Sequence, residues 1–78
     1  MAAPQIYQWV IYFGASDWPA GLYVVRRWAC LPAPHPEGAA VGCGSLDEAR
    51  DFIAKAQPGL VCIERTPQDD PVIVEVWT

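Results

Sequence analysis

The stretch SLDEARDFIAKAQPGL, residues 45–60, decides the fold. It opens with a capping box: the Ser45 hydroxyl can accept a hydrogen bond from the Glu48 amide, and the Glu48 carboxylate can reach back to the Ser45 amide. Apolar side chains then recur with helical spacing at Leu46, Ala49, Ile53 and Ala56. The Pro58-Gly59 pair ends the pattern. The sequence therefore predicts one amphipathic helix between Ser45 and Pro58.

Four runs of β-branched and aromatic residues surround this helix and are typical of strands. Two precede it, at residues 6–13 and 22–29, and two follow it, at residues 60–65 and 72–77. The proline-rich stretch before the helix is expected to be irregular, with a short edge strand near residues 39–42. The order ββαββ predicts an α+β fold, one antiparallel sheet with a single helix packed on one face. A chain of 78 residues forms a single domain, 1–78.

The second predicted strand carries one arginine on each of its faces. Arg26 alternates with Val24 and Trp28 on one face, and Arg27 lies on the other. Such a strand is not expected between two apolar layers, so one face of the sheet should be open to water or to a partner. Trp28 and Trp77 are expected on this sheet, where they could form an aromatic patch of the kind that anchors protein interfaces.

Negative charge is concentrated in the second half of the chain. The net charge of −4 arises wholly from residues 45–78, which hold seven acids and three bases, because the charges of residues 1–44 cancel. The helix and the following strand are similar in length, so the turn at residues 66–71 should return beside the first helical turn. This predicts an acidic pole made of Asp47, Glu48, Asp51, Asp69 and Asp70. The alternative is that these carboxylates serve locally, as helix caps and turn residues.

Few residues in the chain could support catalysis. The one histidine, His35, lies in the proline-rich loop, and Ser45 is better explained as a helix cap than as a nucleophile. Residues 42–44 lack the lysine that follows a phosphate-binding loop. We therefore expect no enzyme, no catalytic residues and no cofactor.

The three cysteines are odd in number and show no disulfide framework, which indicates reduced thiols in a cytoplasmic protein. Cys43 precedes the helix cap, where the helix dipole could favour a thiolate, but no resolving cysteine stands nearby in sequence. Together with His35, the residues Cys30, Cys43 and Cys62 could surround a zinc ion. Their spacing lacks the C-x2-C knuckle of recognisable zinc sites, so we expect idle thiols and no metal.

The composition also narrows the class of partner. No signal peptide and no membrane span are evident, so we expect a cytoplasmic protein with no membrane partner, in the host cytoplasm if the chain is phage-encoded. An acidic chain without a row of basic residues cannot release counterions from a phosphate backbone, and this release supplies much of the affinity for nucleic acid. Direct nucleic-acid binding is therefore not expected. A protein with a basic surface suits it better. A hydrophobic share of 53% with four tryptophans should leave aromatic surface for that partner or for a homodimer.

The run SLDEARDFIAKAQPGLVCIERTPQDDPVIVEVW, residues 45–77, resembles a small group of bacterial and phage proteins. These proteins pair a capped LDEAR-type helix with a PGL turn and a DDPVIVEVW-type final strand. The resemblance carries no catalytic residues, and residues 1–44 show nothing comparable. In size, acidity and lack of a reaction motif, the chain is also similar in kind to phage-encoded anti-CRISPR proteins directed against type I systems.

This second resemblance implies a non-enzymatic inhibitor or adaptor. Its expected partner is a basic protein surface on a nucleic-acid-handling assembly, such as a Cas effector subunit of a type I RNA-guided surveillance complex. The candidate binding residues are those of the acidic pole together with Trp28 and Trp77. The alternative is a homodimeric accessory or structural protein of a phage or bacterium, without inhibitory activity.

Overall fold

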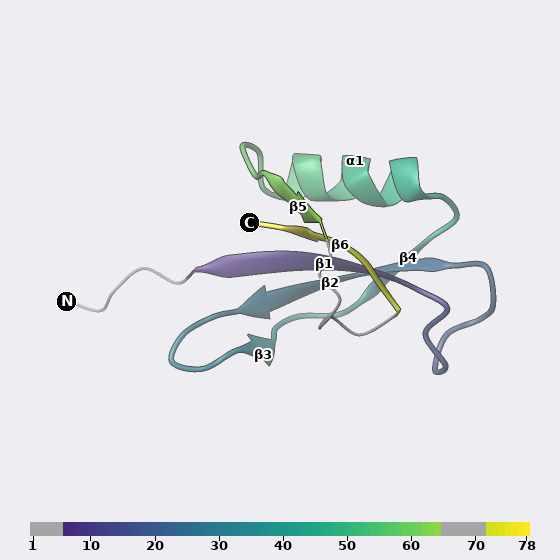
Figure 1. The fold of residues 1–78 in the computed structure, drawn as a ribbon, viewed down its shortest axis with the longest axis horizontal. Coiled ribbons are helices and arrows are strands. Elements are labelled where there is room, and N and C mark those ends of the chain that lie inside the picture. The colour runs from purple at the N-terminus through teal and green to yellow at the C-terminus, as the bar shows by residue number, and fades with distance from the viewer. Residues whose placement is uncertain (1–5, 65–71) are drawn as a thin grey trace.

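The computed structural model of the chain describes residues 6–64 and 72–78. Within these ranges a single helix lies on one face of a β-sheet (Figure 1). In chain order the elements are β1 (Tyr7–Phe13), β2 (Tyr23–Ala29), β3 (His35–Pro36), β4 (Val41–Cys43), α1 (Leu46–Ala56), β5 (Cys62–Glu64) and β6 (Ile73–Trp77). The predicted α+β fold, an antiparallel sheet with one helix packed against it, is confirmed.

The sheet has six antiparallel strands in the order β3-β2-β1-β6-β5, and β4 also pairs with β2. The first strand lies between its neighbour in sequence and the last strand, with Trp9 opposite Arg27 on β2 and opposite Trp77 on β6. Figure 1 shows β1 and β6 side by side under the helix. The two ends of the chain therefore form the centre of the sheet.

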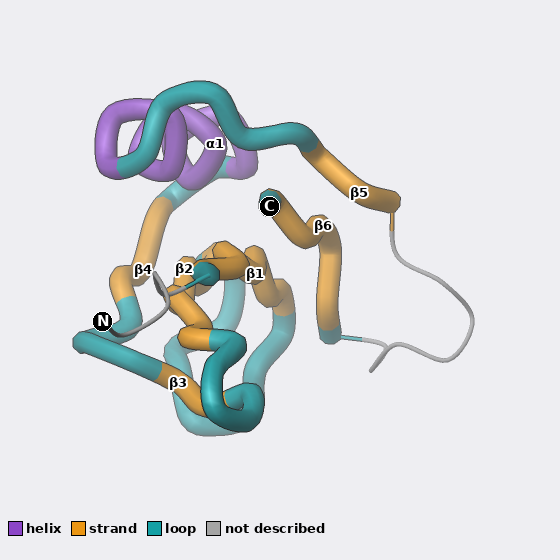
Figure 2. The backbone as a smooth tube through the Cα atoms, turned by 90° about the vertical axis from the view of Figure 1, so that its left-hand side faces the viewer, coloured by secondary structure: helices purple, strands orange, loops and turns teal. Residues whose placement is uncertain are grey.

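Alternation along β1 and β2 builds the hydrophobic core on the helix side. Trp9 and Ile11 from β1 and Val25 from β2 are buried there with Ala49 and Ile53 from α1. These five side chains are each at most 8% exposed. Leu46, Ala49 and Ile53 of the stripe predicted for the helix thus pack against the core, whereas Ala56 of that stripe is exposed. Figure 2 shows the helix above β1 and β2, with β3 farther from the helix.

The helix has the N-terminal cap and the terminating Pro-Gly turn that the sequence predicts, with one difference in the cap. The Ser45 hydroxyl accepts a hydrogen bond from the Glu48 amide at 3.1 Å. The Glu48 carboxylate, however, accepts from the Gly44 amide at 2.9 Å rather than from the Ser45 amide. After the helix, Gly59 has a positive φ of 88°, a conformation that favours glycine and turns the chain back toward the sheet.

The strands after the helix depart from simple alternation. Ile11 pairs with Glu75 but Tyr12 pairs with Ile73, so Val74 is an extra residue in β6. This is a β-bulge, in which two residues of one strand oppose one residue of the next. Alternation alone predicts that Val74 faces away from Glu75, and that prediction is wrong: Val74 packs against the helix-side core, and Glu75 bonds to the helix residue Arg50.

The remaining differences concern short elements. β5 spans Cys62–Glu64 of the strand expected at residues 60–65, of which residue 65 lies outside the described ranges, and the short edge strand expected near residues 39–42 is found at Val41–Cys43. The two-residue β3 is not predicted by the sequence. No helix in the described ranges is long and apolar enough to cross a membrane.

Candidate functional site

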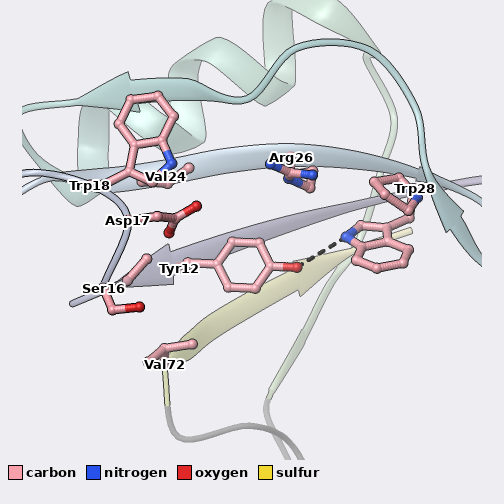
Figure 3. A pocket seen from close by; sticks show the side chains of 10 residues that line it. Tyr12, Ser16, Asp17, Trp18, Val24, Arg26, Trp28 and Val72 are labelled. Carbon is pink, nitrogen blue, oxygen red and sulfur yellow. Dashed lines mark hydrogen bonds between the residues drawn. The ribbon is translucent and has the colours of Figure 1, made fainter.

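A hollow of about 440 Å³ lies on the sheet face opposite the helix (Figure 3). It is formed by β1, the loop between β1 and β2, β2 itself, β3 and the residue before β6, and its wall includes Tyr12, Asp17, Trp18, Arg26, Trp28 and Val72. Trp18 and Asp17 lie at one end, Trp28 lies at the other, and Tyr12 and Arg26 lie between them. The open sheet face expected from the second strand is therefore a lined depression.

Hydrogen bonding holds two of the aromatic rings in place. The Trp28 indole N–H donates to the Tyr12 hydroxyl at 3.0 Å. The two residues stand on neighbouring strands, diagonally across the paired residues Val10 and Arg26. Since the Tyr12 oxygen accepts this bond, its own proton remains available for a further acceptor. The bond orders one end of the hollow.

The opposite end depends on a glycine. The Trp18 amide donates to the Ala15 carbonyl at 3.2 Å, which closes the turn that carries the ring. The Trp18 ring then packs on the backbone of β4, where a Cβ added at Gly42 would lie only 3.1 Å from a ring carbon. Any larger residue at this position would push the ring away, so Gly42 sets the position of this wall.

Arg26 supplies the cation of the hollow. Its side chain is half-buried and has no hydrogen-bond or ion-pair partner among residues 6–64 and 72–78. Arg27, the next residue, lies on the helix side, where it pairs with Glu37 at 2.8 Å and lies over the Tyr7 ring at 4.4 Å. Two adjacent arginines thus have opposite environments, one satisfied within the fold and one facing the hollow.

The described part of the acidic pole lies on the helix. The Asp47 side chain is 96% exposed and lies 3.7 Å from Arg50, and the Asp51 side chain is 62% exposed and pairs with Lys55 at 2.8 Å. Glu48 is engaged in the cap. The structure therefore brings Asp47, Glu48 and Asp51 together at the start of α1. Asp69 and Asp70 lie outside the described residues, so their place beside the helix stays a prediction.

A fourth carboxylate, which the sequence analysis missed, ties the helix to the sheet. Glu75 on β6 accepts from the Arg50 guanidinium, at 3.0 Å from Nε, and also from the Trp77 indole N–H at 3.2 Å. The Arg50 hydrogen bond lowers the pKa of Glu75, against the opposing effect of burial, and Glu75 in turn raises the pKa of Arg50. The sequence feature that could have indicated this pair is the position of Glu75 between two valines in the last strand.

The predicted aromatic patch is wrong. Trp28 lines the hollow, whereas Trp77 packs against the core on the helix side. The register explains the separation, because Trp77 lies opposite Trp9 and Trp28 lies opposite Gln8, and adjacent positions of β1 point to opposite faces. The two tryptophans cannot form one surface.

The surroundings of Cys43 oppose a reactive thiolate. Cys43 is buried, and burial together with the nearby Glu48 charge raises its pKa, which opposes the thiolate suggested by its position before the helix. None of the three cysteines forms a disulfide. Within residues 6–64 and 72–78, no group of three or more His, Cys, Asp or Glu side chains is placed to hold a metal ion.

In comparisons with known proteins, no family model, curated protein or solved structure matches the chain.

Proposed function

We propose that this protein is a binding module, a non-enzymatic inhibitor or adaptor, whose helix α1 binds a basic surface of a nucleic-acid-handling protein assembly. One observation carries the proposal: Asp47 and Asp51 extend into solvent from a helix whose opposite face is fixed to the sheet, with side chains 96% and 62% exposed. A rigid helix that presents carboxylates outward can meet lysines and arginines without reorganising its backbone.

The ion pairs within the helix do not prevent this contact. Asp47 with Arg50 and Asp51 with Lys55 are pairs between neighbouring turns of an exposed helix. Such surface pairs contribute little to stability, because water screens them and both side chains lose freedom. Lysines or arginines of a partner can therefore replace Arg50 and Lys55 at small cost. In a contact that excludes water, the new pairs would be stronger than the old ones.

The charge of the whole chain favours a basic partner. A net charge of −4 on 78 residues speeds encounter with a positive surface and disfavours contact with phosphate backbones. Surfaces that evolved to hold nucleic acid are basic, so an acidic protein can occupy them in its place. Type I RNA-guided surveillance complexes, the partner class implied by the likeness in kind to anti-CRISPR proteins, are the first partners to test.

The test compares two charge reversals that change the net charge equally. Asp47→Lys alters the helix face, and Asp17→Lys alters an exposed carboxylate on the other side of the sheet. We expect Asp47→Lys to weaken binding to purified type I complexes by about tenfold or more, because like charges then face each other across the contact. Asp17→Lys should bind within about twofold of the parent protein, because only long-range attraction changes. Equal weakening by both variants, or no binding by the parent protein, would refute the proposal.

A homodimer is the second candidate, favoured by exposed apolar side chains around β5. Val61 is 66% exposed and Ile63 is 48% exposed, and β5 is the last strand in the sheet order. Apolar edge strands pair readily with a second copy. Light scattering would support this candidate if the protein is a dimer that Ile63→Lys converts to a monomer. A monomer at every concentration would exclude it.

A further inference from the structure

We propose that the hollow on the sheet face opposite the helix binds a small molecule made of a planar aromatic body joined to one anionic group, a carboxylate or a phosphate monoester. This goes beyond the proposed function, because the hollow and the acidic helix lie on opposite sides of the sheet and share no residue. Three features of the hollow lead to this ligand: a cation without an ion-pair partner among the described residues, fixed aromatic walls and a single acidic rim residue.

Arg26 provides the anion-binding group. It is the only lysine or arginine in the wall, and the described chain offers its side chain no acidic partner. A guanidinium presents several N–H donors in one plane, which match the two oxygens of a carboxylate or phosphate. The Tyr12 hydroxyl, which already accepts from Trp28, can donate its proton to the same anion. In an acidic protein, a half-buried arginine that no carboxylate of the described ranges pairs with is the unusual feature of this face.

The rings provide a surface for a planar ligand. Trp18 stands at one end of the hollow and Trp28 at the other, with Tyr12 between them. The Trp28–Tyr12 hydrogen bond and the packing of Trp18 on Gly42 fix these walls before a ligand arrives. Little ordering is therefore needed on binding, which favours affinity. Stacking against Trp or Tyr faces suits flat ring systems better than aliphatic chains.

Size and charge limit the ligand further. A volume of about 440 Å³ lies within the range of small-molecule sites, roughly 300–1,000 Å³, and suits one ring system with one short substituent. Asp17 is exposed on the rim, where it repels additional negative charge and can accept a hydrogen bond from an N–H of the ligand. Polyphosphates and nucleic acid are thereby disfavoured against ligands with one anionic group.

The first experiment uses ligand probes with the unaltered protein. Indole-3-acetate and adenosine monophosphate represent the carboxylate and phosphate forms, indole-3-acetamide and adenosine are their uncharged counterparts, and acetate and inorganic phosphate are anions without a ring. Calorimetry should give a dissociation constant on the order of 1 mM or tighter for at least one aromatic anion. Its uncharged and ringless counterparts should bind about tenfold more weakly. Whichever of indole-3-acetate and adenosine monophosphate binds more tightly shows whether the site prefers a carboxylate or a phosphate monoester.

Nuclear magnetic resonance locates the bound probe. The indole N–H signals of Trp18 and Trp28 should shift on titration, because both rings line the hollow. The Trp9 signal should not shift, because this indole donates to Gln57 on the helix side at 2.8 Å. The same spectrum shows whether each variant below remains folded.

Variants then separate the contributions of the Arg26 charge and the Trp18 ring to ligand binding. Arg26→Met should weaken binding by about tenfold or more, whereas Lys55→Met, which removes the same charge from the exposed helix face, should leave it unchanged. Gly42→Ala should weaken it severalfold by displacing the Trp18 ring. The proposal fails if no aromatic anion binds with a dissociation constant of about 1 mM or tighter. It also fails if the uncharged probes bind equally well, or if folded Arg26→Met protein binds like the parent.

Discussion

Single residues show how strand alternation assigns different tasks to adjacent positions. Arg26 and Arg27 are chemically identical neighbours, yet Arg27 is held by Glu37 and the Tyr7 ring while Arg26 faces the hollow. Removing Arg27 would leave a carboxylate and an aromatic face without their cation. Removing Arg26 would break no hydrogen bond or ion pair of its side chain within the described chain, so polar bonding in the fold gives no reason for an arginine at this position.

The ion pair between Arg50 and Glu75 should make stability depend on pH. The pKa of Glu75 is lowered in the folded state, chiefly by the Arg50 hydrogen bond. A carboxylate with a lowered folded pKa contributes stability above its unfolded pKa, about 4.3, and loses that contribution as the pH falls through the folded value. We therefore expect Glu75→Gln to lower the urea midpoint at pH 7 and to have a smaller effect at pH 3. Equal effects at both pH values would contradict this assignment.

At the scale of the element, helix α1 was predictable because its signals are local. The capping serine, the first-turn acids, the apolar stripe and the terminal Pro-Gly all lie within residues 45–59. Two details differ from the expectation: the Glu48 carboxylate accepts a hydrogen bond from the Gly44 amide instead of the Ser45 amide, and Ala56 of the predicted apolar stripe is exposed. Each local preference agrees with the tertiary packing, which places Ala49 and Ile53 in the core.

Loss of the cap should be measurable in the whole protein. Ser45→Ala leaves the Glu48 amide without its acceptor, so we expect a loss of about 1 kcal/mol in the free energy of unfolding and a melting temperature lower by roughly 4–8 °C. Ser16→Ala is the matched control, because Ser16 is an exposed loop residue and its replacement should change stability by less than about 0.5 kcal/mol. Similar losses in both variants would show that the capping bond contributes little.

The bulge and the short strands were not predictable for the opposite reason. Val74 becomes an extra residue only because Glu75 and Tyr12 each find partners from distant parts of the chain. No local pattern marks that event. The same holds for β3, whose two residues pair with Trp28 and Ala29. No feature of the proline-rich sequence indicates this pairing.

At the scale of the whole molecule, the candidate site depends on topology more than on motif. The hollow combines residues from β1, β2, β3, the first loop and the start of the last strand, which the sheet order alone brings together. Sequence reasoning predicted that one face of the sheet is open, but it did not say which face, and it could not place Tyr12, Trp18 and Val72 there. It also placed Trp28 and Trp77 together, because the pairing of β1 with both strands was unknown. The exposure of Asp47 and Asp51, by contrast, follows from the helical stripe.

The most direct test of the proposed function is zero-length carbodiimide cross-linking of this protein to a purified type I surveillance complex, with mass-spectrometric mapping of the joined residues. The reagent links a carboxylate to a lysine only when the two are in contact. If α1 is the binding surface, cross-links to lysines of the complex will form through Asp47 or Asp51, whose side chains are 96% and 62% exposed. A stable complex whose cross-links run only through carboxylates away from the helix, such as Asp17 or Glu37, would contradict it.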